Sequence, residues 1–123
     1  VVEDEVPLIK AIQIKLEKHG LSVVSARSVE QAMHYLEDLE KVDAVWLDHY
    51  LLGEGDGLDF VLKLKGDNQN WNTIPIFVVS NTAGPDTMQS YVALGINKYY
   101  VKAAHRLDEI VEDLRKFLEN PEL

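Results

Sequence analysis

The chain has 123 residues, of which 46% are hydrophobic, and it contains no cysteine. This length favours one domain with a core of its own, and the lack of cysteine excludes disulfides, thiolate nucleophiles and cysteine-ligated zinc. The formal net charge of −9 argues against a nucleic-acid partner, because an acidic surface repels a phosphate backbone. No apolar run approaches the roughly 18 residues of a membrane span. We therefore expect a cytoplasmic protein with no membrane contact.

Short apolar runs predict five β-strands. Residues 44–47 form an uninterrupted run that ends abruptly at Asp48, which is typical of a parallel strand buried on both faces. Together the expected strands cover residues 1–2, 21–26, 44–47, 74–79 and 99–101. The first strand looks truncated, because the chain begins inside a β-branched pair.

Apolar residues at helical spacing predict five helices. Pro7 suits the first turn of the first helix, and Ser28 with Gln31 forms a capping-box pattern before the second. Gly20 and Gly95 are placed to end the first and fourth helices. The expected helices cover residues 7–19, 29–39, 60–64, 86–94 and 107–118, with Pro121 just beyond the last.

The alternation of strands and helices predicts an α/β fold, a doubly wound parallel sheet with helices on both faces. Ligand sites in such sheets form outside the carboxyl ends of the strands. The polar residues that follow the expected strands all fall on that edge: Glu3, Asp4, Asp48, Ser80 and Lys102.

These residue types indicate phosphoryl chemistry that depends on a cation. Three carboxylates close together repel one another and favour a bound cation, and oxygen ligands in a small open site suit Mg²⁺. A carboxylate can attack phosphorus to form an acyl phosphate, and Asp48 is the best placed because it ends the central apolar strand. Lys102 would neutralise charge on the transferred group, and Ser80 could donate a hydrogen bond to it.

The chain resembles the receiver domain of two-component response regulators, which are CheY-like. The resemblance is carried by VVEDE, VWLDHYLLGEGDG, IPIFVVSNTA and GINKYYVK, in this order and spacing. It implies a flavodoxin-like (βα)5 fold over residues 1–123, with a five-stranded parallel sheet, five helices and no output domain. It also implies that Asp48 accepts a phosphoryl group from a histidine kinase or a histidine phosphotransfer protein.

The resemblance implies roles for further residues. Asp4, Asp48 and the backbone carbonyl of Tyr50 would bind Mg²⁺ directly, and Glu3 would act through water. Ser80 would be the hydroxyl switch residue and Lys102 the lysine that pairs with the phosphoryl group. Tyr99 would be the aromatic residue that turns inward on activation, although strand packing alone could also explain it.

Three departures from the family pattern stand out. Leu52 replaces the usual proline four residues after Asp48, in a loop that is one residue longer than the commonest form. Asn81 replaces a small residue and could crowd the phosphoryl site. Ala103 follows Lys102 where a cis proline is usual, and a cis bond before a residue other than proline costs about 2.5–4 kcal/mol. We therefore expect a trans bond between Lys102 and Ala103, and a loop of different shape before the last helix.

The leading hypothesis is a signalling switch that turns over no external substrate. Its partner surface, for a homodimer or an output protein, would be the face of the fourth helix, fifth strand and fifth helix. The alternative is a pseudo-receiver that binds proteins independently of phosphorylation. An aspartate phosphatase would need a second acid where Tyr50 stands, and a flavin site would need a Ser/Thr/Gly-rich loop where EDEVP stands. The histidines share no metal-ligand spacing and are interpreted as incidental.

Overall fold

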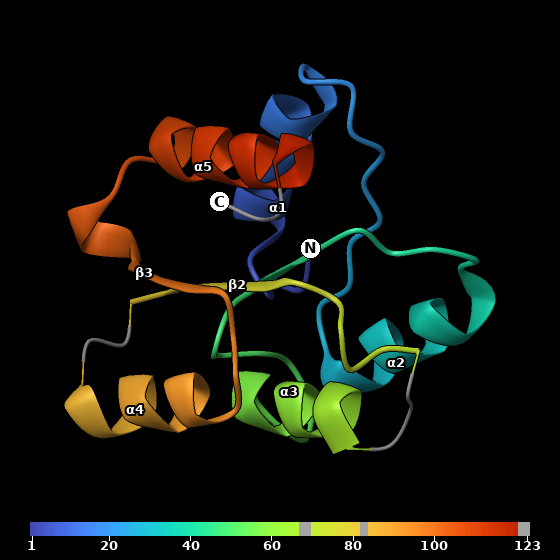
Figure 1. Ribbon diagram of the computed structural model, residues 1–123, viewed down its shortest axis with the longest axis vertical. Coiled ribbons are helices and arrows are strands. Elements are labelled where there is room, and N and C mark those ends of the chain that lie inside the picture. The colour runs from blue at the N-terminus through green and yellow to red at the C-terminus, as the bar shows by residue number, and fades with distance from the viewer. Residues whose placement is uncertain (67–69, 82–83, 121–123) are drawn as a thin grey trace.

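The computed structural model describes residues 1–66, 70–81 and 84–120. Its helices and strands follow in the order α1 (Val6–Glu17), α2 (Val29–Asp38), β1 (Val45–Leu47), α3 (Gly57–Gly66), β2 (Ile76–Ser80), α4 (Pro85–Ala93), β3 (Lys98–Val101), the 3₁₀ turn η1 (Lys102–Ala104) and α5 (Leu107–Glu119). Figure 1 shows α1 and α5 on one face of the sheet and α2, α3 and α4 on the other. The predicted doubly wound α/β class is confirmed.

The strands are parallel and lie in the order β1-β2-β3. Val45 pairs with Ile76 at the start of β1, and Phe77 pairs with Lys98 at the start of β3. Val2 continues the sheet beyond β1 through isolated parallel bridges to Leu47 and Ala26. The chain therefore reverses its direction of winding between the segment at Val2 and β1, which is where sites form in such folds.

The first two predicted strands are present only as these bridges. The amide of Val2 donates to the carbonyl of Trp46 at 2.7 Å, and the amide of Glu3 donates to the carbonyl of Ala26 at 2.9 Å. Residues 21–25 form no regular strand. The amides of Glu3 and Ala26 each donate one hydrogen bond across this pair, too few for a regular ladder. A groove of about 420 Å³ lies beside residues 21–24.

The core consists of two apolar clusters, one on each face of the sheet. Between the sheet and α2, α3 and α4 the side chains include Leu36, Phe60, Val61, Val78 and Tyr91. Between the sheet and α1 and α5 they include Ile12, Leu16, Trp46, Phe77 and Ile110. Alternate residues of each strand enter opposite clusters, so the strands must be apolar on both faces, as the continuous runs predicted.

The helix ends agree with the sequence signals in most places. The Ser28 hydroxyl accepts from the Gln31 amide at 3.1 Å, which confirms the predicted cap of α2. The third helix is longer than predicted and starts at Gly57, because Asp56 and Asp59 cap it reciprocally. The Asp59 amide donates to the Asp56 carboxylate at 3.1 Å, and the Asp56 amide donates to the Asp59 carboxylate at 2.8 Å.

The loop after β3 differs from the family pattern in the expected way. The described part of the chain holds no cis peptide bond, so the bond between Lys102 and Ala103 is trans, and η1 redraws the path to α5. Pro121, Thr82, Ala83 and part of the turn-rich segment before Ile74 lie outside the described residues. Within the described ranges, no helix is long and apolar enough to cross a bilayer.

Candidate functional site

The site lies at the edge of the sheet formed by the carboxyl ends of its strands, where a polar residue ends or follows each strand. Glu3 and Asp4 follow the bridge at Val2, and Asp48 directly follows β1. Ser80 is the last residue of β2, and Lys102 follows β3. Because parallel strands end at the same edge, residues far apart in the sequence meet there, as the sequence predicted.

Lys102 joins two buried carboxylates. Its Nζ lies 3.1 Å from Glu3 Oε2 and 3.3 Å from Asp48 Oδ2. Glu3 and Asp48 are both buried, and the Lys102 side chain is mostly so. The other Asp48 oxygen, Oδ1, accepts from the backbone amide of His49 at 2.8 Å. Asp48 is thereby held at both oxygens, which fixes the orientation of its carboxylate.

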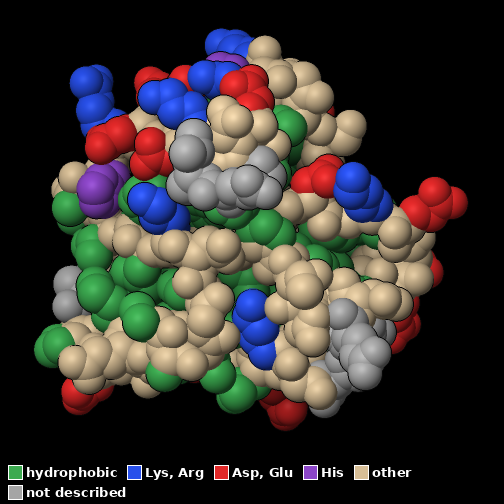
Figure 2. All heavy atoms as spheres, viewed as in Figure 1, with side chains coloured by type: hydrophobic (Ala, Val, Ile, Leu, Met, Phe, Trp, Pro, Cys, Tyr) green, Lys and Arg blue, Asp and Glu red, His purple; other side chains and the backbone are tan. Residues whose placement is uncertain are grey.

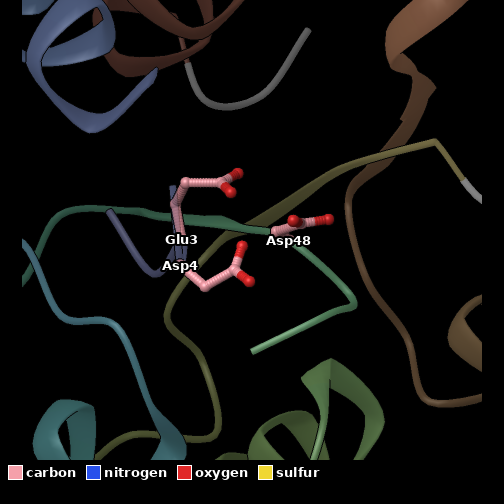
Figure 3. A group of neighbouring side chains, drawn as sticks. All are labelled: Glu3, Asp4 and Asp48. Atoms are coloured by element: carbon pink, nitrogen blue, oxygen red, sulfur yellow. The ribbon is translucent and has the colours of Figure 1, made fainter. Parts of the chain in front are cut away.

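The three acids form one compact group. A carboxylate oxygen from each of Glu3, Asp4 and Asp48 lies within 4.8 Å of the others. Figure 3 shows the three carboxyl groups pointing to the same side of the chain segments that carry them. The arrangement brings three carboxyl groups close together, and Lys102 contacts two of them.

Burial and neighbouring charges shift the pKa values of Glu3 and Lys102. Burial and the nearby Asp48 carboxylate raise the pKa of Glu3 to about 7, although Lys102 and the Glu5 amide oppose the shift. Burial acts to lower the pKa of Lys102, but the Asp48 and Glu3 carboxylates outweigh it and raise that pKa. Glu3 therefore holds a proton more tightly than a free glutamate does, as expected where negative charge is in excess.

A hard cation fits this donor set. All the donors are oxygens, and one of the three acids is only partly buried. These are the properties of a site for Mg²⁺, which takes oxygen ligands and keeps several waters. Asp4 and Asp48 are the candidate ligands: Asp4 is the least buried of the three acids, and an oxygen of Asp48 lies within 4.8 Å of it, although Lys102 and the His49 amide also contact the Asp48 carboxylate.

Ser80 and Tyr99 are neighbours on adjacent strands. Ser80 is fully buried and Tyr99 is half-buried; burial raises the pKa of Tyr99, and the nearby Ser80 hydroxyl opposes that shift. The Tyr99 ring also contacts the ring of Tyr91 from α4, with centroids 5.7 Å apart. The two predicted switch residues thus lie close to each other, and Tyr99 packs against α4.

The departure at Leu52 has a structural counterpart. Its backbone amide donates to the carbonyl of Arg27 at 2.9 Å, and residues 28 and 52 form a parallel bridge. Proline could not donate this bond, because it has no amide hydrogen. Arg27 in turn donates from Nε and Nη2 to the Asp4 carbonyl, at 2.9 and 2.7 Å. The loop after Asp48 is therefore connected through Arg27 to the acidic segment.

Two residues of this region escaped sequence analysis. His49 was interpreted as incidental, yet its Nδ1 lies 2.6 Å from the hydroxyl of Tyr91. Arg27 had no assigned role. Adjacency to Asp48 was the available signal for His49, whereas nothing in the sequence around Arg27 indicated that its side chain reaches a backbone carbonyl 23 positions away.

Two further expectations stay predictions. Asn81 is exposed directly after β2, and crowding of a phosphoryl group by it remains to be tested. Tyr50 lies two residues after Asp48 with an exposed side chain, and binding of metal by its carbonyl is also untested.

Known proteins share this fold. The response regulator receiver domain family matches residues 1–115. The phosphorylated cyanobacterial phytochrome response regulator RcpA is 27% identical, with a TM-score of 0.83 over 99% of this chain and 93% of that one. The BeF₃-activated receiver domain of RstA from Klebsiella pneumoniae is 26% identical, with a TM-score of 0.80 over 97% and 96%. A two-component response regulator from Clostridium difficile shares the fold, with a TM-score of 0.85 at 19% identity over 99% and 95%.

The fold and the acid–lysine edge define a doubly wound α/β protein of the CheY-like kind. The chain belongs to the response regulator receiver domain family, the signalling module of two-component systems. Receiver domains of this family interact with histidine kinases or phosphotransfer proteins, and they generally bind Mg²⁺ at an acidic cluster.

Proposed function

We propose that Asp48 is the phosphoacceptor of this receiver domain and that its phosphorylation switches a partner-binding surface. The observation that carries the proposal is the pairing of the buried Asp48 carboxylate with Lys102 beside Glu3 and Asp4. An oriented carboxylate oxygen attacks the phosphorus of a phosphohistidine donor, and an acyl phosphate forms as the bond between phosphorus and nitrogen breaks.

The neighbouring residues would balance charge, donate a hydrogen bond and bind the cation. Lys102 stays charged and balances the negative charge of the phosphoryl group, and the Ser80 hydroxyl donates a hydrogen bond to it. Asp4, Asp48 and the Tyr50 carbonyl would hold Mg²⁺, with Glu3 acting through water. When bound, the cation supplies positive charge to the phosphoryl oxygens.

The switched surface would be the face formed by α4, β3 and α5. Tyr99 lies on this face and close enough to Ser80 for the hydroxyl to influence its pKa, so a change at Ser80 is expected to alter the position of Tyr99. Val92 of α4 is 63% exposed, and Figure 2 shows hydrophobic side chains gathered on the side of the view where β3 and α4 lie. A histidine kinase or phosphotransfer protein would deliver the phosphoryl group, and an output protein or a second copy of the chain would bind this face.

Intact mass after incubation with acetyl phosphate and Mg²⁺ tests the proposal. The protein should gain one phosphoryl group, and the gain should disappear in Asp48→Asn and in the presence of EDTA. Asp43→Asn is the matched control, because Asp43 is an exposed aspartate at the opposite end of the same strand.

Two outcomes would contradict the proposal. Uptake retained in Asp48→Asn would assign the acceptor to another residue. A folded protein that takes no phosphoryl group from acetyl phosphate or from a cognate kinase would instead be a pseudo-receiver, and the search would turn to a constitutive protein partner.

A further inference from the structure

A hydrogen bond connects α4 to the residue next to Asp48. Tyr91 is fully buried, and its hydroxyl lies 2.6 Å from Nδ1 of His49. The two rings meet edge to face, with centroids 5.6 Å apart. Only 12% of the His49 side chain is exposed. The contact joins a helix on one face of the sheet to the loop that leaves the phosphoacceptor strand.

The Tyr91 hydroxyl keeps its proton in this buried position. Burial raises the pKa of Tyr91 strongly, and the negative charge of Asp56 adds to the effect, so the hydroxyl keeps its proton. The hydroxyl can donate to Nδ1 or accept from it, so the contact fixes the two groups relative to each other in either case. The other ring nitrogen of His49, Nε2, lies 3.7 Å from the Asp56 carboxylate.

The backbone between His49 and Gly57 lies very close to the Tyr91 hydroxyl. The Gly57 amide donates to the His49 carbonyl at 2.9 Å and closes the loop between them. A Cβ at Gly57 would lie 2.2 Å from the Tyr91 hydroxyl oxygen and 3.1 Å from Cα of His49. Only glycine leaves room for this approach, so three chain segments converge on one hydroxyl group.

Tyr91 contacts the site from two directions. Through His49 it reaches Asp48, because the His49 amide donates to Asp48 Oδ1 at 2.8 Å. Through its ring it packs against Tyr99, which lies near Ser80. A shift of either Asp48 or Tyr99 is therefore transmitted to the same buried side chain of α4.

We propose that Tyr91 is a positioning residue for phosphoryl transfer, which acts through His49 to hold the Asp48 carboxylate in its reactive orientation and to link it to α4. This inference rests on the proposed role of Asp48 as phosphoacceptor. The hydroxyl of Tyr91 fixes the His49 ring, the ring fixes the backbone of residue 49, and the amide of that residue orients Oδ1.

The test compares Tyr91→Phe with Tyr100→Phe. Both variants lose one hydroxyl from a buried tyrosine, but the Tyr100 hydroxyl donates to Asp113 of α5 and has no contact with the loop. Tyr91→Phe should take up phosphoryl groups from acetyl phosphate roughly three- to tenfold more slowly, the effect of losing one hydrogen bond. Amide hydrogen exchange at residues 49 and 57 should accelerate to a similar degree. Tyr100→Phe should change neither.

A pair of substitutions at His49 separates positioning from general packing. His49→Asn keeps an acceptor close to the place of Nδ1, whereas His49→Ala removes it. We expect His49→Asn to retain most of the uptake rate and His49→Ala to match Tyr91→Phe.

Equal behaviour of Tyr91→Phe and Tyr100→Phe, or faster uptake by Tyr91→Phe, would overturn the inference. If the unmodified protein takes up no phosphoryl group, the proposed function fails. The exchange rates at residues 49 and 57 then decide the positioning role by themselves.

Discussion

The two sides of the sheet are held together in different ways. β1, β2 and β3 form a continuous parallel ladder, in which every residue of β1 and β2 is buried. The segment at Val2 is held by single bridges to Leu47 and Ala26, next to an open groove. The candidate site spans both sides, because Asp48, Ser80 and Lys102 end the ladder and the other acids lie on the bridged side.

The difference shows that the two groups of site residues depend on different forces. The residues on the ladder side are positioned by backbone pairing and core packing, so changes there should act mainly on stability. Glu3 and Asp4 are positioned by a few backbone hydrogen bonds and by the side chains of Lys102 and Arg27. Changes on that side should act mainly on charge balance and cation binding.

Gly57→Ala should cause the largest loss on the ladder side. The added Cβ would lie 2.8 Å from the Asp48 carbonyl oxygen and 2.2 Å from the Tyr91 hydroxyl oxygen, and backbone cannot move aside cheaply. We expect a loss of about 3 kcal/mol or more in the free energy of unfolding, measured with urea. Gly66→Ala in the same helix is the control, because an added Cβ there has no described atom within 4 Å. Equal free energies of unfolding for the two variants would show that the loop can move to accommodate the added methyl group at little cost.

Removal of the same two methyl groups on each side of the sheet gives a second comparison. Val78 is fully buried in the centre of β2, whereas Val2 lines the groove. Val78→Ala should lower the free energy of unfolding by about 2–3 kcal/mol, and Val2→Ala by roughly half as much. The cavity term explains the difference, because a space beside an open groove can fill with water or collapse. Equal losses would mean that the bridged side is packed as tightly as the ladder.

The raised pKa of Glu3 predicts a pH-dependent stability in the absence of divalent cations. The folded-state pKa of about 7 lies above the ordinary value of 4.5. Its contribution to stability is therefore complete below about pH 4.5 and is lost as the pH rises through about 7. From pH 5 to 8, the free energy of unfolding should fall on the order of 2 kcal/mol more than it does in Glu3→Gln.

The raised pKa of Lys102 does not interfere with this measurement. The pKa of this lysine is also raised, so its contribution is lost only well above pH 8 and leaves the measured window unaffected. Parallel pH profiles for the protein and Glu3→Gln would show that Glu3 is ionised throughout and that its pairing with Lys102 outweighs its burial.

Arg27→Lys should give the smallest effect and should act on the cation. Lysine keeps the charge but loses the planar fork that donates twice to the Asp4 carbonyl. We expect Mg²⁺ affinity, followed by the fluorescence of Trp46, to fall roughly two- to fivefold, with little change in stability. Arg106→Lys, an exposed arginine before α5, should leave the affinity unchanged. A normal affinity in Arg27→Lys would remove this side chain from the positioning of Asp4.

Several local features of the fold followed from short stretches of sequence. The stripe of Ile110, Val111 and Leu114 identified α5, and the apolar run before Asp48 identified β1. These patterns work because burial is periodic along a single element. The strand predicted over residues 21–26 fails for a related reason: an apolar pattern signals burial, and pairing needs a partner that the pattern does not report.

The sequence by itself determined the α/β class and the convergence of Glu3, Asp4, Asp48, Ser80 and Lys102 at one edge, because strand direction alone brings the carboxyl ends of parallel strands together. Only the tertiary structure decided which side chains connect that edge to its surroundings. The bond from Tyr91 to His49 spans 42 positions and depends on how closely α4 packs against the loop that Gly57 closes. Contacts of this kind arise from three-dimensional packing between elements, which the periodicity of each element leaves open.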